Sequence, residues 1–304
     1  MLIPDVGTRV VLRYRLPPGA GHLYTDVTGE LLASGATLSV AGRRGEITVA
    51  LSEVVAIKAI PARPVARREI RDLESAAARG WPGLQSTLIE GWLLRAGSGF
   101  TTRANCALPL APHASLKALP AIAHWYATRN LPLQMAVIEQ LLTAPPGWDK
   151  YRAASMLTAA VTSLNTADIT MTLLDSPSAR WLSLFRGGTA VTVEAIEVVR
   201  AVDGAATFGC YYVDGDLAAI ARAAITVSDS GRKWLGLSSL EVASPYRRRG
   251  IATAMMDQLT AWGTECGATS VYLQVMQDNP HAAAMYRAIG YTEHHTYQYA
   301  SPPT

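Results

Sequence analysis

The chain has 304 residues, of which 49% are hydrophobic and 17% charged, and its formal net charge is +3. This composition excludes an intrinsically disordered protein, and a net charge this small does not by itself support nucleic-acid binding. The length predicts two or three compact units rather than one.

The first 60 residues contain four or five short segments of alternating hydrophobicity, separated by turn residues such as Gly42 and Gly45. This number of short strands predicts a small β-barrel of SH3-like type over residues 1–60. Such barrels often bind peptides or nucleic acids, but the segment has no aromatic cluster that would form a groove. A structural or regulatory role is therefore preferred. Pro61-Ala-Arg-Pro64 is expected to be a linker.

Residues 65–164 are predicted to form a second unit of mixed helices and strands. Its expected elements are an acidic helix ending near Gly80, a hairpin over about 91–110, a helix over 116–127 and a strand over 133–138. The alanine-rich segment Tyr151–Leu164 follows a break at 145–147, and we expect it to be a connecting helix because alanine favours helices.

Residues 165–304 are predicted to form a third unit. Strands are expected near 169–173, 207–213, 217–227, 235–242, 271–275 and 291–299, and helices near 177–185 and 191–199, after Gly250 and after Asn279. The region near 177–200 is largely apolar with few charges, and its acidic residues are Glu194 and Glu197. Strands alternating with helices in this order predict an α/β fold.

A basic turn joins the strand that ends at Val242 to the next helix, with the sequence Arg247-Arg248-Arg249-Gly250-Ile251-Ala252. The unpaired N–H groups at a helix N-terminus favour a phosphate, and arginines add charge-assisted donors. Gly250 lets the backbone approach such a ligand, because it has no Cβ. A turn of this kind can equally be an ordinary basic surface turn, and the motif alone does not decide between the two.

The order of long strand, loop, helix and strand occurs twice. Cys106–Leu116 stands in the first copy where Ser239–Arg249 stands in the second, and the first copy lacks the basic glycine turn. A real repeat would therefore leave one phosphate site, in the second copy. Chance periodicity is the alternative.

The three cysteines, Cys106, Cys210 and Cys266, are far apart, and none lies in a C-x-x-C pair or at metal-ligand spacing from a histidine. We therefore expect free thiols, with neither a disulfide framework nor a metal site. No apolar run reaches membrane-spanning length, and the N-terminus lacks the features of a signal peptide. A soluble cytoplasmic protein without membrane contact is the default expectation.

Three features in the correct order resemble the GNAT superfamily of acyl-CoA N-acyltransferases. They are Leu240-Glu-Val242 before the basic turn, the strand Val271–Val275, and the segment Asn279-x-x-Ala282-x-x-Met285-Tyr286-x-x-x-Gly290-Tyr291. The whole chain is also similar to a subgroup, common in actinobacteria, that places a small barrel and a degenerate GNAT half before the active unit. The resemblance implies a mixed central sheet flanked by helices, with the catalytic GNAT domain at 165–304.

The resemblance implies acetyl-CoA as co-substrate and assigns roles to individual residues. The pyrophosphate of acetyl-CoA would bind the turn formed by Arg247, Arg248, Arg249, Gly250, Ile251, Ala252 and Thr253. Its pantetheine arm would pair with the backbone of Leu240 and Val242, and Asn279 would bond this arm or order the loop. Tyr286 would act as general acid for the departing thiolate. Asn279 is also suited to cap the helix that follows it, and Tyr286 to be a core residue.

Glu241 lies at the working end of its strand and is the candidate base for the attacking amine, with a water chain as the other route. A structural or surface glutamate is the alternative, since a strand bulge would decide which way it points. His281, His294 and His295 have no spacing that supports catalysis, and we expect them on the surface.

These expectations lead to one preferred function and two alternatives. The preferred function is acetyl transfer from acetyl-CoA to an amine of a small molecule or peptide, with a homodimer left open. The first alternative is a non-catalytic CoA-binding sensor that acts through its N-terminal domains. Nucleic-acid binding through the Arg43-Arg44 turn is disfavoured on charge.

Overall fold

The computed structural model describes residues 2–43, 45–61, 63–161 and 169–303. The chain divides into two compact units, Met1–Pro64 and Val65–Thr304. Arg44 of the basic barrel turn, Ala62 of the linker and the 164/165 boundary lie outside the described residues. The further division of the second unit at that boundary therefore stays a prediction. None of the helices in the described ranges is both long and apolar enough to cross a bilayer.

The first unit is one antiparallel sheet in the order β4-β3-β2-β1-β5. Its strands are β1 (Arg9–Arg15), β2 (Tyr24–Ser34), β3 (Thr37–Gly42), β4 (Gly45–Ala50) and β5 (Val54–Ala59), with a 3-10 turn, η1 (Leu51–Glu53), before the last. The inward residues form their own small core: Val10, Leu12, Leu31, Leu38, Val40 and Val49. The strand-rich N-terminal unit expected from the sequence is thus present.

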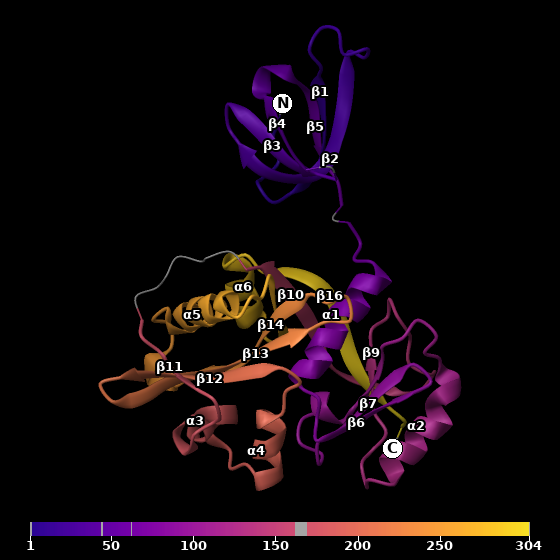
Figure 1. Ribbon diagram of the computed structural model, residues 1–304, viewed down its shortest axis with the longest axis vertical. Helices are drawn as coiled ribbons and strands as arrows, with labels where there is room; N and C mark the ends of the chain where they lie inside the picture. Colours follow the sequence, from indigo (N-terminus) through magenta and orange to yellow (C-terminus); the bar gives the residue numbers. More distant parts are fainter. Residues whose placement is uncertain (1, 44, 62, 162–168, 304) are drawn as a thin grey trace. The chain divides into compact units, whose positions relative to one another are not determined.

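Within the described part of the second unit, eleven strands form one mixed sheet in the order β11-β12-β13-β14-β15-β10-β16-β9-β8-β7-β6 (Figure 1). The strands are β6 (Gln85–Ile89), β7 (Trp92–Ala96), β8 (Ala107–Pro109), β9 (Met135–Val137), β10 (Asp149–Ala160), β11 (Thr172–Leu174), β12 (Ala205–Val213), β13 (Asp216–Val227), β14 (Lys233–Val242), β15 (Ser270–Met276) and β16 (Thr292–Ser301). The helices are α1 (Arg67–Gly80), α2 (Leu119–Ala127), α3 (Ala179–Leu184), α4 (Val193–Arg200), α5 (Ile251–Glu265) and α6 (Pro280–Ala288). A mixed sheet flanked by helices confirms the predicted fold class.

The sheet order has an internal symmetry. Toward the centre of the sheet, the parallel pair β8–β9 is followed by β16, and the parallel pair β14–β15 is followed by β10. Each half therefore gives its last strand to the sheet of the other half, and β10 and β16 pair with each other at the centre. This arrangement supports the architectural repeat seen in the sequence.

The alanine-rich segment Tyr151–Leu164 is not a helix, which corrects the sequence expectation. Residues 149–160 form β10, which pairs with β15 on one side and β16 on the other. Two partner strands satisfy the backbone groups of this segment, and such tertiary pairing overrides the helix propensity of alanine. Residues 162–164 lie outside the described part.

Successive side chains along the strands point to opposite faces of the sheet, and a different set of helices packs against each face. Leu235 and Leu273 pack with the core that includes α5 and α6, whereas Trp234 and Tyr272 pack against α1. On β12 and β13, Phe208 and Ile220 pack with α3 and α4. Figure 1 shows α5 and α6 on one side of the sheet and α3 and α4 on the other. The alternation of strand side chains explains this layering.

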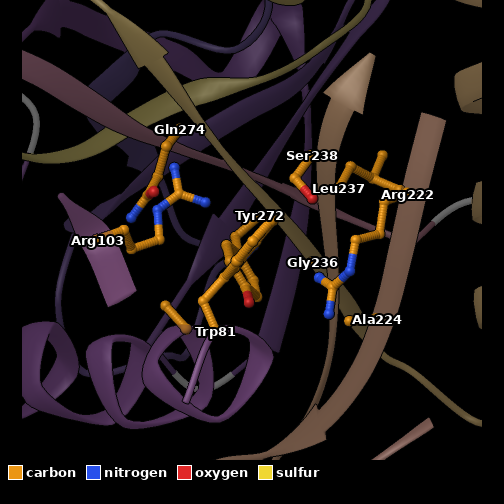
Figure 2. Close-up of a pocket in the computed structure, with 10 residues that line it drawn as sticks. Trp81, Arg103, Arg222, Ala224, Gly236, Leu237, Ser238, Tyr272 and Gln274 are labelled. Carbon is orange, nitrogen blue, oxygen red and sulfur yellow. The ribbon is translucent and has the colours of Figure 1, made fainter. Parts of the chain in front are cut away.

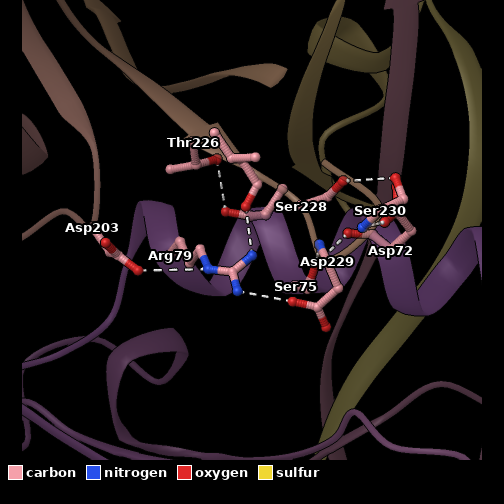
Figure 3. Close-up of polar contacts among 10 residues, drawn as sticks. Asp72, Ser75, Arg79, Asp203, Thr226, Ser228, Asp229 and Ser230 are labelled. Carbon is pink, nitrogen blue, oxygen red and sulfur yellow. Dashed lines mark hydrogen bonds and ion pairs between the residues drawn. The ribbon is translucent and has the colours of Figure 1, made fainter. Parts of the chain in front are cut away.

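Helix α1 is fixed to the turn between β13 and β14 by a polar network (Figure 3). The Arg79 guanidinium donates to the Val227 carbonyl and to the Asp229 carboxylate. Ser75 Oγ accepts from the Asp229 backbone N–H, and Asp72 accepts from the Ser230 N–H. The helix that opens the second unit is therefore anchored to its C-terminal half.

His295 is buried, which corrects the expectation that it lies on the surface. Its Nε2 lies 2.9 Å from the Glu74 carboxylate of α1, and its Nδ1 lies 2.8 Å from Nδ1 of His294. Only 2% of His295 is exposed, and His294 is half-buried. His281 is exposed, as expected. The β16 register explains the burial, because a strand covered by a helix hides alternate residues.

The half-buried His294 makes stability depend on pH. Burial, together with a smaller effect of the neighbouring His295, lowers the pKa of His294 from 6.5 to about 4. Between these values the unfolded chain binds more protons than the folded one, so stability is complete above pH 6.5 and is lost toward pH 4. We expect the free energy of unfolding to fall by about 1–2 kcal/mol between pH 7.5 and 5.0 from this group.

Urea denaturation of His294→Gln at both pH values checks this expectation. The substitution should remove that share of the pH dependence, whereas His281→Gln, which changes an exposed histidine, should keep it. An equal pH dependence in wild type and His294→Gln would contradict the assignment.

Candidate functional site

The central feature of the site is the separation of β14 from β15. The two strands pair in parallel only from Trp234–Ser270 to Leu237–Leu273, although β14 continues to Val242. Beyond that point β15 is held by β10 alone. Backbone groups on the facing edges of the two strands are therefore left without a strand partner.

A cavity of about 280 Å³ lies in this opening, on the side of α5 and α6. Its lining brings together four of the predicted site residues, Leu240, Glu241, Asn279 and Tyr286. Residues from the facing strand, including Gln274 and Val275, form the opposite wall. The structure thus assembles at one place residues that are up to 46 positions apart in the sequence.

A bulge in β14 decides the direction of Glu241. Ser239 has φ 54°, and Ser239 and Leu240 together oppose the single residue Ala221 of β13. After the bulge Glu241 lies opposite Ile220, whose side chain faces α3 and α4. The bulge therefore turns Glu241 away from α5 and toward the loop that follows α3.

The Glu241 carboxylate binds the backbone of that loop. It accepts hydrogen bonds from the N–H of Arg186, at 2.5 Å, and from the N–H of Gly187, at 2.9 Å. Both residues have left-handed backbone angles inside the short turn η4 (Phe185–Gly188), so their N–H groups converge on one anion. Glu241 thus has a positioning role in this structure, whether or not it also takes a proton.

The basic turn lies between β14 and the N-terminus of α5, after a short 3-10 turn, η5 (Ser244–Tyr246). Gly250 is the N-cap of α5 with φ 78°, and no side chain caps the first N–H groups of the helix. The Arg247 side chain donates to the Val242 carbonyl at 2.9 Å. Arg248 and Arg249 are exposed, and the Arg249 guanidinium lies 5.6 Å from the Tyr246 ring. The turn combines free helix-end donors with three cations.

Some predicted site residues lie apart from the cavity lining. Ile251 is buried in the core beneath α5, and Val242 packs partly against the same core. The basic turn and Thr253 are not part of the cavity wall, which lies nearer the strand opening. The basic turn and Thr253 follow β14 directly in the chain, so a ligand that reaches both this turn and the cavity would have to be long.

Asn279 and Tyr286 both belong to α6. Asn279 Oδ1 accepts from the Ala282 N–H at 3.1 Å, which makes it the N-cap, and Pro280 takes the first helical position. Tyr286 lies one to two turns later and contributes to the cavity wall, with its ring 5.9 Å from that of Tyr291. Burial raises the pKa of Tyr286, so its hydroxyl stays protonated at neutral pH.

A second cavity of about 260 Å³ lies against the opposite face of the strand opening, and the sequence did not predict it. Both cavities are lined by the same stretch of β14, Leu237–Ser239, and by Gln274 and Met276 of β15. The second cavity also takes residues from distant segments: Trp81, Thr101, Thr102, Arg103, Arg152, Phe185, Arg186, Tyr297 and Tyr299. The polar Ser238 and Gln274 in the middle of buried strands are the signal in the sequence that could have indicated it.

A water-sized cavity adjoins the second one (Figure 2). Figure 2 shows Arg103 and Gln274 together on one side of Tyr272, with Arg222 on the other. The Arg222 guanidinium lies 4.5 Å from the Trp81 ring and donates to the carbonyls of Gly80, Val199 and Ala201. Burial lowers its pKa to about 10. Arg222 is therefore fully used in joining α1 to the sheet.

The described part of the chain holds no group of three or more His, Cys, Asp or Glu side chains arranged to bind a metal ion. All three cysteines are free, with Cys106 and Cys210 buried and Cys266 half-buried.

Two family models match the sequence. Residues 67–300 match the model described as "Probable histone acetyltransferase Rv0428c C-terminal", and residues 4–58 match "Rv0428c N-terminal Sm-like domain". The first match covers most of the second compact unit. The second match assigns a Sm-like domain to the N-terminal sheet, and the SH3-like type stays a prediction.

Relatives and a solved structure agree with these matches. A Mycobacterium tuberculosis protein named "Probable histone acetyltransferase Rv0428c" is 35% identical over 298 residues, which cover 97% of this chain and 95% of that protein. A Bacillus subtilis protein named "Uncharacterized N-acetyltransferase YobR" is 28% identical, with 75% of this chain and 97% of that protein covered. The structure of a GCN5-related N-acetyltransferase from Kribbella flavida has a TM-score of 0.55 at 17% identity, and the match covers 80% of this chain and 97% of that chain.

Substitution of Glu241 by Gln tests its contact with the loop. The amide group of Gln can accept only through its oxygen, so one of the N–H groups of Arg186 and Gly187 loses a charged acceptor. We expect amide exchange of these two residues to accelerate about 5- to 30-fold, which corresponds to the loss of about 1–2 kcal/mol. Hydrogen exchange read by NMR measures the effect.

Glu197→Gln is the matched control, because this exposed carboxylate of α4 pairs with the side chain of Arg200 and with no other cation among the described residues. It should leave exchange at Arg186 and Gly187 unchanged. Unchanged exchange in the Glu241 variant as well would show that the two hydrogen bonds do not hold the loop.

Proposed function

The chain belongs to the family that the Rv0428c C-terminal model describes and is a GNAT-type acetyltransferase with an N-terminal small barrel domain; we propose that it transfers the acetyl group of acetyl-CoA to an amine by direct attack in a ternary complex. The observation that carries this proposal is the opening between β14 and β15, with Tyr286 in its wall. The acceptor is an amine of a small molecule or of a protein. The mycobacterial relative is named for histones, so a lysine side chain is one candidate.

The residues of the site fit a CoA thioester. The uncapped N-terminus of α5, which carries the positive end of the helix dipole, and the three neighbouring arginines suit the pyrophosphate. The backbone edge of β14 at Leu240 and Val242, which does not pair with β15, suits the amide groups of the pantetheine arm, which would add to the sheet like a strand. Asn279 caps α6 at the rim of the cavity and keeps the loop before it in place.

The reaction needs one proton donor and one proton acceptor. The amine nitrogen forms a bond to the thioester carbonyl carbon, and the carbon–sulfur bond then breaks. The protonated hydroxyl of Tyr286 gives its proton to the departing thiolate. The amine proton passes to the Glu241 carboxylate, directly or through water, because each Glu241 oxygen retains a lone pair besides the one bonded to the loop.

Incubation of the full chain with acetyl-CoA and a library of amines, read by mass spectrometry, tests the function. We expect an acetylated amine and free CoA in equal amounts. Binding of acetyl-CoA without transfer to any amine would reject the enzymatic proposal and favour a CoA-binding sensor.

Removal of the Tyr286 hydroxyl tests the general acid. Tyr286→Phe should lower kcat about 100-fold, the usual size of a general-acid contribution, and leave the Kd for acetyl-CoA unchanged. Steady-state kinetics and calorimetry measure the two quantities.

Tyr291→Phe is the control, because Tyr291 is a buried neighbour whose hydroxyl has no hydrogen-bond partner among the described residues. It should retain normal turnover. A normal kcat in Tyr286→Phe would exclude the proposed acid role.

A Cβ at Gly250 tests the pyrophosphate turn. Gly250 and Gly231 both have left-handed backbone angles with open space around the Cβ position, but only Gly250 lies at the N-terminus of α5. We expect alanine at either position to cost about 1–2 kcal/mol of stability. Gly250→Ala alone should raise the Kd for acetyl-CoA, by about tenfold, because the methyl group covers the helix-end donors.

Isothermal titration calorimetry with acetyl-CoA separates the two effects, and Gly231→Ala serves as the control for backbone strain. Equal Kd values for the two variants would show that the turn does not bind the co-substrate.

A further inference from the structure

The second cavity contains three cationic side chains and no carboxylate in its lining. Arg103, Arg152 and Arg186 come from three separate segments and meet at this cavity. None of them forms an ion pair with an acidic residue within the described ranges. Surface arginines normally find acidic neighbours, so three unpaired cations around one small cavity produce a local positive potential.

The carboxylates of Glu241 and Glu74 are bonded elsewhere and are not part of this lining. Glu241 is bonded to the backbone N–H groups of the loop that carries Arg186, and Glu74 is buried beside His295. Neither residue lines the second cavity. The field within the cavity therefore favours an anion.

Three buried polar atoms at the same place have no hydrogen-bond partner among the described residues. They are Nε of Arg103, Oγ of Ser238 and Oε1 of Gln274. All three residues line the second cavity, and Ser238 and Gln274 also line the first. Buried polar atoms in proteins are almost always bonded, so such a cluster marks a place where a ligand or water supplies the missing partners.

Two of the three arginines lie near aromatic rings. The Arg103 guanidinium lies 5.6 Å from the Trp81 ring, and that of Arg186 lies 5.2 Å from the Phe100 ring. Stacking restricts a guanidinium and leaves its N–H edge free for an anion. Arg152 has a left-handed backbone angle at the irregular start of β10, where the pairing with β16 shifts register.

We propose that the acceptor of acetyl transfer is a small primary amine that also carries a carboxylate or a phosphate, and that Arg103, Arg152 and Arg186 bind this anionic group. The proposal rests on the function proposed above, because it assigns the second cavity to the acceptor. The amine lies toward Ser238 and Gln274, where the two cavities share their walls, and the anion lies toward the arginines.

The size and walls of the cavity support a small acceptor. Its volume of about 260 Å³ is below the range of pockets for drug-sized ligands. Phe185, Tyr297 and Tyr299 provide aromatic walls. A cationic peptide would bring further positive charges toward the three arginines, and like charges in a confined site disfavour binding.

Matched pairs of amines test the proposal in the full chain. The pairs are O-phosphoethanolamine with ethanolamine and L-phenylalanine with L-phenylalaninamide, and a lysine-rich histone-tail peptide is a third arm. We expect at least one anionic member to have a kcat/KM about 10- to 100-fold above that of its neutral or cationic partner. The phosphate and carboxylate arms identify which anion is preferred. Raised salt should reduce the difference.

Arginine variants test the binding site itself. Arg103→Gln and, separately, Arg186→Gln should each lower kcat/KM for the anionic amine about 10- to 100-fold and leave the Kd for acetyl-CoA unchanged. Arg186 is exposed, so its variant remains informative even where Arg103→Gln impairs folding. Arg68→Gln is the control, since Arg68 is exposed on α1 and lies outside both cavities.

The outcomes separate this proposal from the proposed function. Efficient acetylation of the histone-tail peptide or of ethanolamine, unaffected by Arg103→Gln and Arg186→Gln, would overturn the anion site and keep the acetyltransferase function. Calorimetric binding of an anionic amine to the CoA-loaded protein, lost in the arginine variants but without acetyl transfer, would support the anion site and contradict the proposed reaction. Failure of every anionic amine to bind or react would overturn the proposal.

Discussion

The site depends on one structural constraint, the loss of pairing between β14 and β15 after Leu237 and Leu273. A parallel pair of strands normally continues as far as both strands extend, but here β15 stays on β10 while β14 follows β13 through the bulge at Ser239. The bulge has two consequences. It opens the cavity lined by Leu240 and Tyr286, and it reverses the direction of Glu241 so that its carboxylate meets the loop after α3. A single extra residue in one strand therefore accompanies both the cavity between β14 and β15 and a contact with the other face of the sheet.

The exchange of the last strands between the two halves explains why the first half is needed although it lacks a basic glycine turn. Strand β10, from the first half, holds β15 on its far edge and so fixes one side of the opening. The short turn η2 (Arg103–Asn105) of the same half brings Arg103 to the second cavity, and β16 brings Tyr297 and Tyr299 from the other direction. The first half thus supplies walls for a site whose basic turn belongs to the second half.

The sequence predicted the parts of the site that depend on local chemistry. Three features are of this kind: the basic turn, the Asn279 cap and the helix of Tyr286. Each combines a distinctive residue with a helix boundary. Such local signals can be read from the sequence because they depend on only a few neighbouring residues. The sequence did not predict the parts whose structure depends on pairing with strands far away in the chain. The segment that became β10 has a helical composition, and only its pairing with β15 and β16 makes it a strand. His295 was expected on the surface because its partner Glu74 is 221 residues away in the chain.

The two faces of the opening carry positive charge for different reasons, and the small net charge of the chain hides both. At the basic turn, the cations are exposed beside free helix-end donors, which suits a flexible diphosphate reached from solvent. At the second cavity, two of the three cations lie near aromatic rings, and neighbouring buried polar atoms have no partner among the described residues, which suits a rigid small anion. Arg222 shows the contrast, because its buried guanidinium donates to three carbonyls and serves the fold. For Arg103, by contrast, Nε has no hydrogen-bond partner among the described residues. A bound ligand therefore explains its buried charge better than a structural role does.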